Sequence, residues 1–148
     1  MTILLVSPGQ APRKITIEDT LAAMQRAVGG PIQAVYPFEE PMALICHEEG
    51  KLLPLPLNRA LRSPDTGEIY DIIAGDFFLC AAPPDNEHFE SLTDDQLERY
   101  ARIFRTPEMF LSGPGSSIIV LPLPDTSLLS PDETALQENP SEPFADCP

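Results

Sequence analysis

The chain has 148 residues, 43% hydrophobic and 22% charged, which is typical of one globular domain rather than of a fibrous or wholly disordered chain. Its net charge of −14 argues against direct nucleic-acid binding, because a polyanion is bound by Lys and Arg side chains that displace its counterions. No stretch of about 18 consecutive apolar residues is present, which argues against a membrane-spanning segment. We therefore expect a cytoplasmic protein.

Proline and charge divide the chain into two parts. Seven of the 18 prolines follow Leu111, and proline lacks the N–H that a sheet ladder or a helix interior needs. Residues 112–148 hold six acidic residues and no Lys or Arg, whereas residues 1–111 hold 17 acidic and nine basic residues. We expect residues 1–111 to form a single compact domain and residues 112–148 to be a disordered acidic tail. The β-prone patch 118–121 either adds a strand to a sheet edge or stays loose.

The first elements along the chain are two strands and a short helix. The apolar runs 3–6 and 13–17 predict a β-hairpin with a long loop. Asp19 is suited to be the N-cap of a helix with one apolar face. Gly29-Gly30-Pro31 ends that helix, with Gly29 at the position where a left-handed residue is expected.

Further strands are predicted in the middle of the chain. The runs 32–36 and 42–46 predict an antiparallel hairpin. The run 69–81 is strand-like on both sides of Gly75, and a glycine in such a run marks a bulge or bend. The segment 52–61 is ambiguous, because its two prolines exclude a regular helix or central strand, and its last four residues fit a single helical turn.

A second helix is predicted near residue 94. Thr93 and Gln96 have the spacing of a capping box, and Thr106-Pro107 stops the helix. Its apolar face consists of Leu97, Tyr100, Ala101 and Phe104. Favourable i, i+4 ion pairs join Asp95 to Arg99 and Glu98 to Arg102. Together these elements predict an α+β fold with two helices and a mainly antiparallel sheet of about four to six strands.

Cysteines and histidines indicate neither a metal site nor a cofactor. Cys46, Cys80 and Cys147 lack paired spacing, and the first two fall in apolar runs, so we expect buried free thiols there. His47 and His88 are 41 residues apart, too few and too distant to suggest a metal centre. The sequence also contains no recognised catalytic motif, so no catalytic residue is assigned.

One candidate interaction surface is acidic. Six acidic residues fall within fourteen positions around the start of the second helix: Asp85, Glu87, Glu90, Asp94, Asp95 and Glu98. They form either a solvated face with favourable charge at a helix N-terminus, or a surface that mimics DNA phosphates and binds a basic host protein. The arginines that follow, Arg99, Arg102 and Arg105, weaken the mimicry.

A second candidate site consists of Asn58, Arg59 and Asp71, polar residues beside runs that we expect in the core. Buried polar groups need partners, and an Arg59–Asp71 ion pair with Asn58 bound to backbone would serve structure alone. Alternatively, the three side chains line a small pocket in which Arg59 offers its planar fork to a carboxylate or phosphate.

Several runs, taken in order, carry a family resemblance: 35–38, 43–46, 48–52, 55–61, 69–78 and 92–96. In this order they resemble domain-of-unknown-function family 3846, over roughly residues 3 to 105. Such proteins are typical of phage, plasmid and conjugative-element genes of bacteria, which the resemblance implies for this chain. The resemblance implies no activity, cofactor or catalytic residue, and it does not reach the tail.

Three functional hypotheses remain. The first is a non-enzymatic accessory protein of a mobile element or phage that binds or modulates a host protein, which predicts one continuous acidic face and no deep pocket. The second is a small-ligand binder in which Asn58, Arg59 and Asp71 converge on a concavity. The third is an enzyme of unrecognised class, which requires a cleft with titratable groups held near one another. The sequence does not set the oligomeric state.

Overall fold

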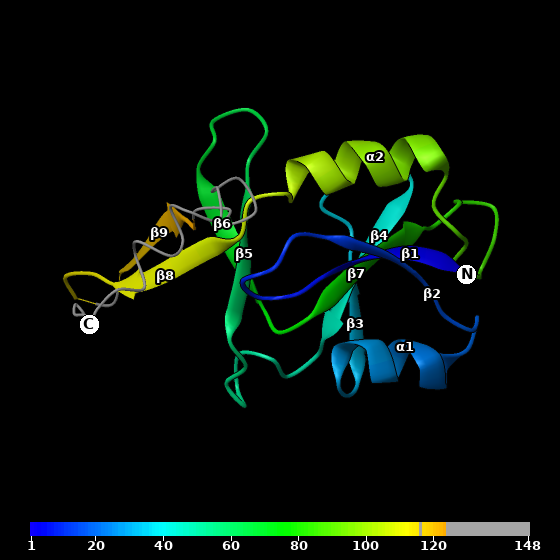
Figure 1. The fold of residues 1–148 in the computed structure, drawn as a ribbon, viewed down its shortest axis with the longest axis horizontal. Coiled ribbons are helices and arrows are strands. Elements are labelled where there is room, and N and C mark those ends of the chain that lie inside the picture. Colours follow the sequence, from blue (N-terminus) through cyan, green and yellow to red (C-terminus); the bar gives the residue numbers. More distant parts are fainter. Residues whose placement is uncertain (116, 124–148) are drawn as a thin grey trace, which may run out of the picture.

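The computed structural model describes residues 1–115 and 117–123, and its centre is a five-stranded antiparallel sheet (Figure 1). The strands lie in the order β2-β1-β7-β4-β3. Their bounds are β1 (Thr2–Val6), β2 (Arg13–Thr16), β3 (Ile32–Val35), β4 (Met42–His47) and β7 (Phe77–Ala81). Both predicted hairpins, β1–β2 and β3–β4, are present. The predicted α+β class is confirmed.

One helix covers each face of this sheet. Figure 1 shows α1 (Leu21–Val28) below the sheet and α2 (Asp94–Ile103) above it. Successive side chains of a strand point to opposite faces, so each central strand supplies both layers of the core. Leu44 and Leu79 belong to the core cluster under α2, whereas Ile45 and Phe78 belong to the cluster under α1. This explains why every residue of β4 is buried.

Local sequence signals define the helix ends. Helix α1 begins after Thr20, whose hydroxyl accepts a hydrogen bond from the Ala23 N–H at 3.1 Å. The prediction of Asp19 as N-cap is therefore wrong by one residue: in the extended backbone before Leu21, it is Thr20 that directly precedes the first turn. Gly29 ends the helix with φ of 87°, as predicted.

The capping box of α2 is confirmed. The Gln96 N–H donates to the Thr93 hydroxyl at 3.1 Å, and the Thr93 N–H donates to the Gln96 side chain at 2.9 Å. Both predicted ion pairs, Asp95–Arg99 and Glu98–Arg102, are also present along the helix.

A second, two-stranded sheet lies beside the main one. It consists of β5 (Leu57–Arg62) and β6 (Ile69–Ala74), paired antiparallel. The predicted helical turn over 58–61 is therefore wrong, because these residues are extended and paired with β6, and the two prolines precede the strand instead of interrupting it. Gly75, with φ of 80°, makes the predicted bend through which the chain passes from β6 into β7.

A third sheet is the hairpin of β8 (Glu108–Ser112) and β9 (Ile118–Pro122). Residues 118–121 neither add a strand to the edge of the main sheet nor stay loose: they lie in β9, which pairs with β8 in a separate sheet. A boundary after residue 111 falls inside β8, and most of the expected tail, from residue 124 onward, lies outside the described residues. Within the described part, no helix is long and apolar enough to cross a bilayer.

Candidate functional site

Asn58 is fully buried and joins separate parts of the fold. Its side-chain amide donates to the backbone carbonyls of Val6 and Gly75, both at 2.8 Å. Its side-chain oxygen accepts from Arg59 at 2.9 Å. Asn58 thus ties β5 to the end of β1 and to the bend after β6, and no part of its amide faces solvent.

Arg59 is also buried, and its guanidinium is saturated with protein partners. Nε donates to the Phe104 carbonyl, Nη1 to the backbone and side-chain oxygens of Asn58, and Nη2 to the carbonyls of Gln10 and Phe104. These bonds, between 2.6 and 3.2 Å, use all five N–H donors of the guanidinium. No donor is left for a carboxylate or phosphate ligand.

Asp71 does not join them. Its carboxylate pairs with Lys51 and accepts from the Ile72 N–H at 2.8 Å, at a half-exposed position of β6. The predicted Arg59–Asp71 pair is therefore wrong: the buried cation finds backbone carbonyls, and the carboxylate finds a lysine near the surface. The structure brings Asn58 and Arg59 together and leaves Asp71 outside.

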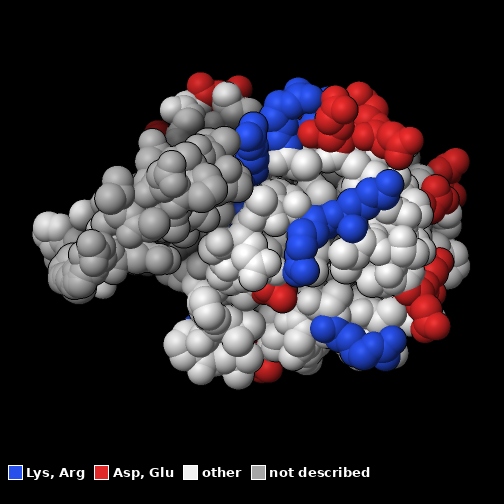
Figure 2. Space-filling view, in the orientation of Figure 1, with Lys and Arg blue, Asp and Glu red and all other residues white. Residues whose placement is uncertain are grey.

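The six predicted acidic side chains are all exposed: Asp85, Glu87, Glu90, Asp94, Asp95 and Glu98. Figure 2 shows acidic residues over α2 and down one edge of this face, with basic side chains beside them. Asp95 and Glu98 are paired with arginines of the same helix, and Glu90 accepts from Asn86 at 2.6 Å. On the face that Figure 2 shows, positive charge lies beside the acidic groups.

The thiols and histidines offer no reactive cluster. Cys46 and Cys80 are buried and free, as predicted, and burial raises the pKa of Cys46 and raises that of Cys80 to about 12. His47 is buried and accepts from the Glu49 N–H through Nδ1 at 3.0 Å. No group of three His, Cys, Asp or Glu side chains converges within the described ranges. Cys147 lies outside them.

A pocket of about 590 Å³ lies between the C-terminal half of α2, the loop before β4 and the β5–β6 sheet. Aromatic residues form much of its wall, namely Phe38, Tyr70, Tyr100 and Phe104. Phe38 meets Tyr100 edge to face with ring centroids 4.9 Å apart, which fixes the wall between the loop and the helix. Arg59 reaches the lining, but its donors are already used.

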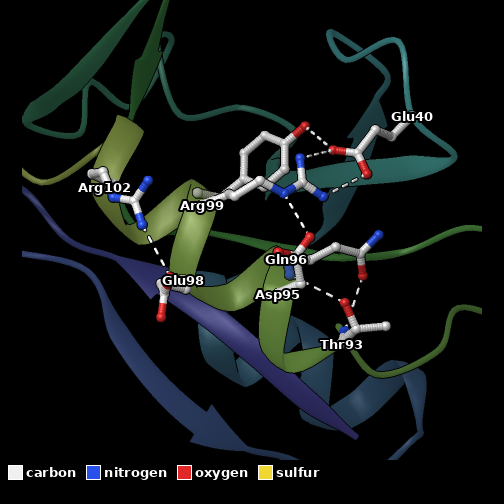
Figure 3. A network of polar contacts seen from close by, with 8 residues as sticks. Glu40, Thr93, Asp95, Gln96, Glu98, Arg99 and Arg102 are labelled. Atoms are coloured by element: carbon white, nitrogen blue, oxygen red, sulfur yellow. Dashed lines mark hydrogen bonds and ion pairs between the residues drawn. The ribbon is translucent and has the colours of Figure 1, made fainter.

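A polar network crosses the rim of this pocket (Figure 3). Glu40, in the loop before β4, receives two hydrogen bonds from the fork of Arg99, at 2.7 and 2.9 Å. The Tyr100 hydroxyl donates to the same carboxylate at 2.6 Å. Arg99 also donates to Asp95 at 2.8 Å, which holds the arginine along its own helix.

These contacts move the pKa values of the network away from neutrality. Hydrogen bonds from Arg99, and then from Tyr100, lower the pKa of Glu40 to about 2. Burial, followed by the hydrogen bond to Glu40, raises the pKa of Tyr100 to about 12. The pKa of Arg99 is raised by its bonds to Glu40 and then to Asp95. At neutral pH the site therefore holds an ionised carboxylate, a protonated phenol and a guanidinium.

A second carboxylate lies at the opposite wall. Glu108, at the start of β8, accepts from the Ala60 N–H at 2.7 Å and from Arg62 at 2.6 Å. It anchors the β8–β9 hairpin to β5 beside the pocket. Sequence reasoning missed both Glu40 and Glu108, because their partners lie 59 and 46 residues away along the chain. The Glu39-Glu40 pair before Pro41 gave no indication of a site, because two acidic residues before a proline are typical of an ordinary solvated turn.

Fold and site together describe a small α+β protein with a ligand-sized, largely apolar pocket at the junction of its sheets. The chain belongs to the family "Domain of unknown function (DUF3846)", whose model matches residues 1–105. No curated protein and no solved structure matches it significantly. The match includes the main sheet, both helices and most of the pocket wall, and it ends before the β8–β9 hairpin.

Proposed function

We propose that the chain is a non-enzymatic binding protein whose ligand is a small, ring-containing molecule with a hydrogen-bond donor or cation at one end. The observation that carries this proposal is the aromatic pocket beside Glu40. Its volume of about 590 Å³ lies within the range of roughly 300 to 1,000 Å³ typical of small-molecule sites. Such sites combine apolar walls with a few fixed polar groups.

The polar end of the ligand is inferred from the acceptors of Glu40. One carboxylate oxygen already accepts from Arg99 and Tyr100, whereas the other accepts from Arg99 alone. A carboxylate offers about four acceptor positions, so these three bonds leave one, near the Gln96 side chain, which a ligand donor would share with or take from that amide. Because the pKa of Glu40 is about 2, the group stays ionised and accepts strong hydrogen bonds at neutral pH.

The same pKa shifts favour binding over acid–base catalysis. A general acid or base works best with a pKa near the working pH. The pKa values of Glu40, about 2, and Tyr100, about 12, are both far from neutrality. At neutral pH the carboxylate therefore stays ionised and the phenol stays protonated. The pocket also favours ligand binding over the acidic-surface hypothesis, which expected no deep concavity.

The biological setting is a further part of the proposal. The family resemblance supports a role as an accessory protein of a phage, plasmid or conjugative element, acting by binding a ligand in the host cell. Two buried free thiols, Cys46 and Cys80, agree with a reducing cytoplasm.

A fragment screen tests the site. We expect ligand-observed NMR on the full chain to detect aromatic amines in preference to aromatic carboxylates of the same size. Tyr70 is an exposed wall residue, so Tyr70→Ser should weaken binding of these amines by about tenfold without unfolding the protein. Tyr36 is similarly exposed and lies off the pocket, so Tyr36→Ser is the matched control.

Two results would contradict the proposal. One is a preference for carboxylate fragments, because the proposal expects the ionised Glu40 to repel them. The other is equal loss of binding in the Tyr70 and Tyr36 variants, which would show that the fragments associate with exposed rings anywhere on the surface.

A further inference from the structure

The β8–β9 hairpin has an apolar face that nothing in the described structure covers. Its strands pair Met109 with Leu121 and Leu111 with Ile119. Paired residues of an antiparallel ladder point to the same side, as do residues two apart in one strand, so these four side chains share one face. Each is between 38% and 44% exposed.

The other face of the hairpin is attached to the body of the protein. Glu108 binds the Ala60 N–H and Arg62 of β5, and Pro122 contributes to the pocket wall. Figure 1 shows the hairpin extending away from the main sheet on the side opposite the N-terminus. The apolar face therefore lies apart from the pocket, and an occupant of one does not fill the other.

Charge indicates what kind of surface this face matches. The chain carries a net charge of −14, yet no charged residue occurs from Met109 to Leu123. A basic or acidic partner would find no complementary charge on the hairpin. An uncharged apolar surface matches another of the same kind, and a second copy of the chain supplies one.

Two copies of this face can pack against each other about a two-fold axis that lies between them, parallel to both hairpins. Such an isologous contact brings the same four side chains of each copy together, and two-fold dimers are the commonest protein assemblies.

We propose that two copies of this chain associate through the face formed by Met109, Leu111, Ile119 and Leu121. The face is small, so the expected dissociation constant is about 10 to 100 µM. The acidic remainder of each copy opposes association, and salt screens that repulsion. Dimerisation should therefore strengthen as the salt concentration rises, unlike binding that depends on opposite charges.

Sedimentation velocity of the full chain tests this proposal, between about 1 and about 200 µM protein. The expected result is a shift from 16.2 kDa towards twice that mass, occurring at lower protein concentration in about 0.5 M than in about 0.05 M salt. A monomer throughout, as expected if residues 124–148 or a different protein cover the face, would overturn the proposal. So would a dimer that weakens with salt.

A lysine substitution identifies the surface. Leu111→Lys reduces the net negative charge, which by itself favours association, but places an unpaired cation on the apolar face. We expect it to weaken dimerisation by about tenfold or more. Leu52→Lys makes the same charge change at an exposed site outside the hairpin, and should not weaken dimerisation. Equal behaviour of the two folded variants would overturn the assignment to this face.

Discussion

Two clusters of polar side chains, Asn58 with Arg59 and Glu40 with Arg99 and Tyr100, differ in how many of their hydrogen-bonding positions the protein itself occupies. Each cluster contributes to the lining of the same pocket. Asn58 and Arg59 are buried, and every donor of the guanidinium has a protein acceptor. Glu40 and Arg99 are partly exposed at the rim and Tyr100 is buried beside them, and the three hydrogen bonds to the carboxylate leave it one further acceptor position, near the Gln96 side chain. A saturated buried group stabilises the fold, whereas a fixed but unsaturated group at a rim can bind a ligand.

The largest expected effect comes from the saturated group. Arg59→Met keeps an apolar stem but leaves the buried carbonyl of Phe104 and the part-buried carbonyl of Gln10 without their donor, so we expect unfolding to require about 3 kcal/mol less free energy. Urea denaturation measures this. Arg62→Met removes a partly exposed ion pair and should cost about 0.5 kcal/mol. Equal losses in Arg59→Met and Arg62→Met would contradict the claim that the buried, saturated arginine contributes more to stability than the exposed ion pair.

The next largest effect on stability is expected for Asn58→Ala. It removes two buried hydrogen bonds to backbone and one acceptor of Arg59, and should lower the free energy of unfolding by about 2 kcal/mol. Because Asn58 and Arg59 share a bond, the double variant should lose less than the sum of the single losses. Asn86→Ala, at an exposed position, is the control, with an expected change within about 0.5 kcal/mol. If the double variant loses as much stability as the two single variants together, Asn58 and Arg59 stabilise the fold independently, which would contradict the shared bond.

The rim network predicts a pH dependence. The folded-state pKa of Glu40, about 2, lies below its ordinary value of 4.5. The stability that the ionised carboxylate contributes is therefore fully present above about pH 5 and is lost as the pH falls towards 2. We expect the melting-temperature difference between wild type and Glu40→Gln to be largest at pH 7 and to vanish near pH 2. Glu39→Gln, the exposed neighbour, should show no such trend, and an E40Q difference independent of pH would contradict the account.

The smallest expected effect is at Asp71. Its pair with Lys51 is exposed, and exposed ion pairs contribute little, so Asp71→Asn should change stability by about 0.5 kcal/mol. Chemical denaturation against wild type is sufficient. A loss as large as that of Arg59→Met would restore the interpretation in which Asp71 belongs to the buried group.

The sequence predicted what local chemistry determines. The capping box of α2, its two ion pairs, the stop at Gly29 and both sheet hairpins depend on residues close in sequence, and all are confirmed. The partner of Arg59 could not be predicted, because the carbonyls that bind it come from Gln10 and Phe104, 49 and 45 residues away. The strand at Asn58 was missed because pairing with β6 outweighs the prolines before it.

The pocket could not be predicted from the sequence for the same physical reason, because its walls come from segments that are far apart along the chain. It exists only where the loop at Glu40, the end of α2 and the β5–β6 sheet meet, and no single segment indicates that meeting. Glu40 has no local partner that would distinguish it from Glu39. Only its contact with Arg99 and Tyr100, across 59 and 60 residues, identifies it as part of a site.

The most direct test of the central claim is to map the binding of an aromatic amine onto the ¹⁵N-labelled full chain by NMR. The account predicts that the perturbed amides surround the pocket, in the loop at 38–40, in β5 at 60–62 and at the end of α2. Perturbations confined to the acidic segment 85–98, with the pocket amides unmoved, would contradict it.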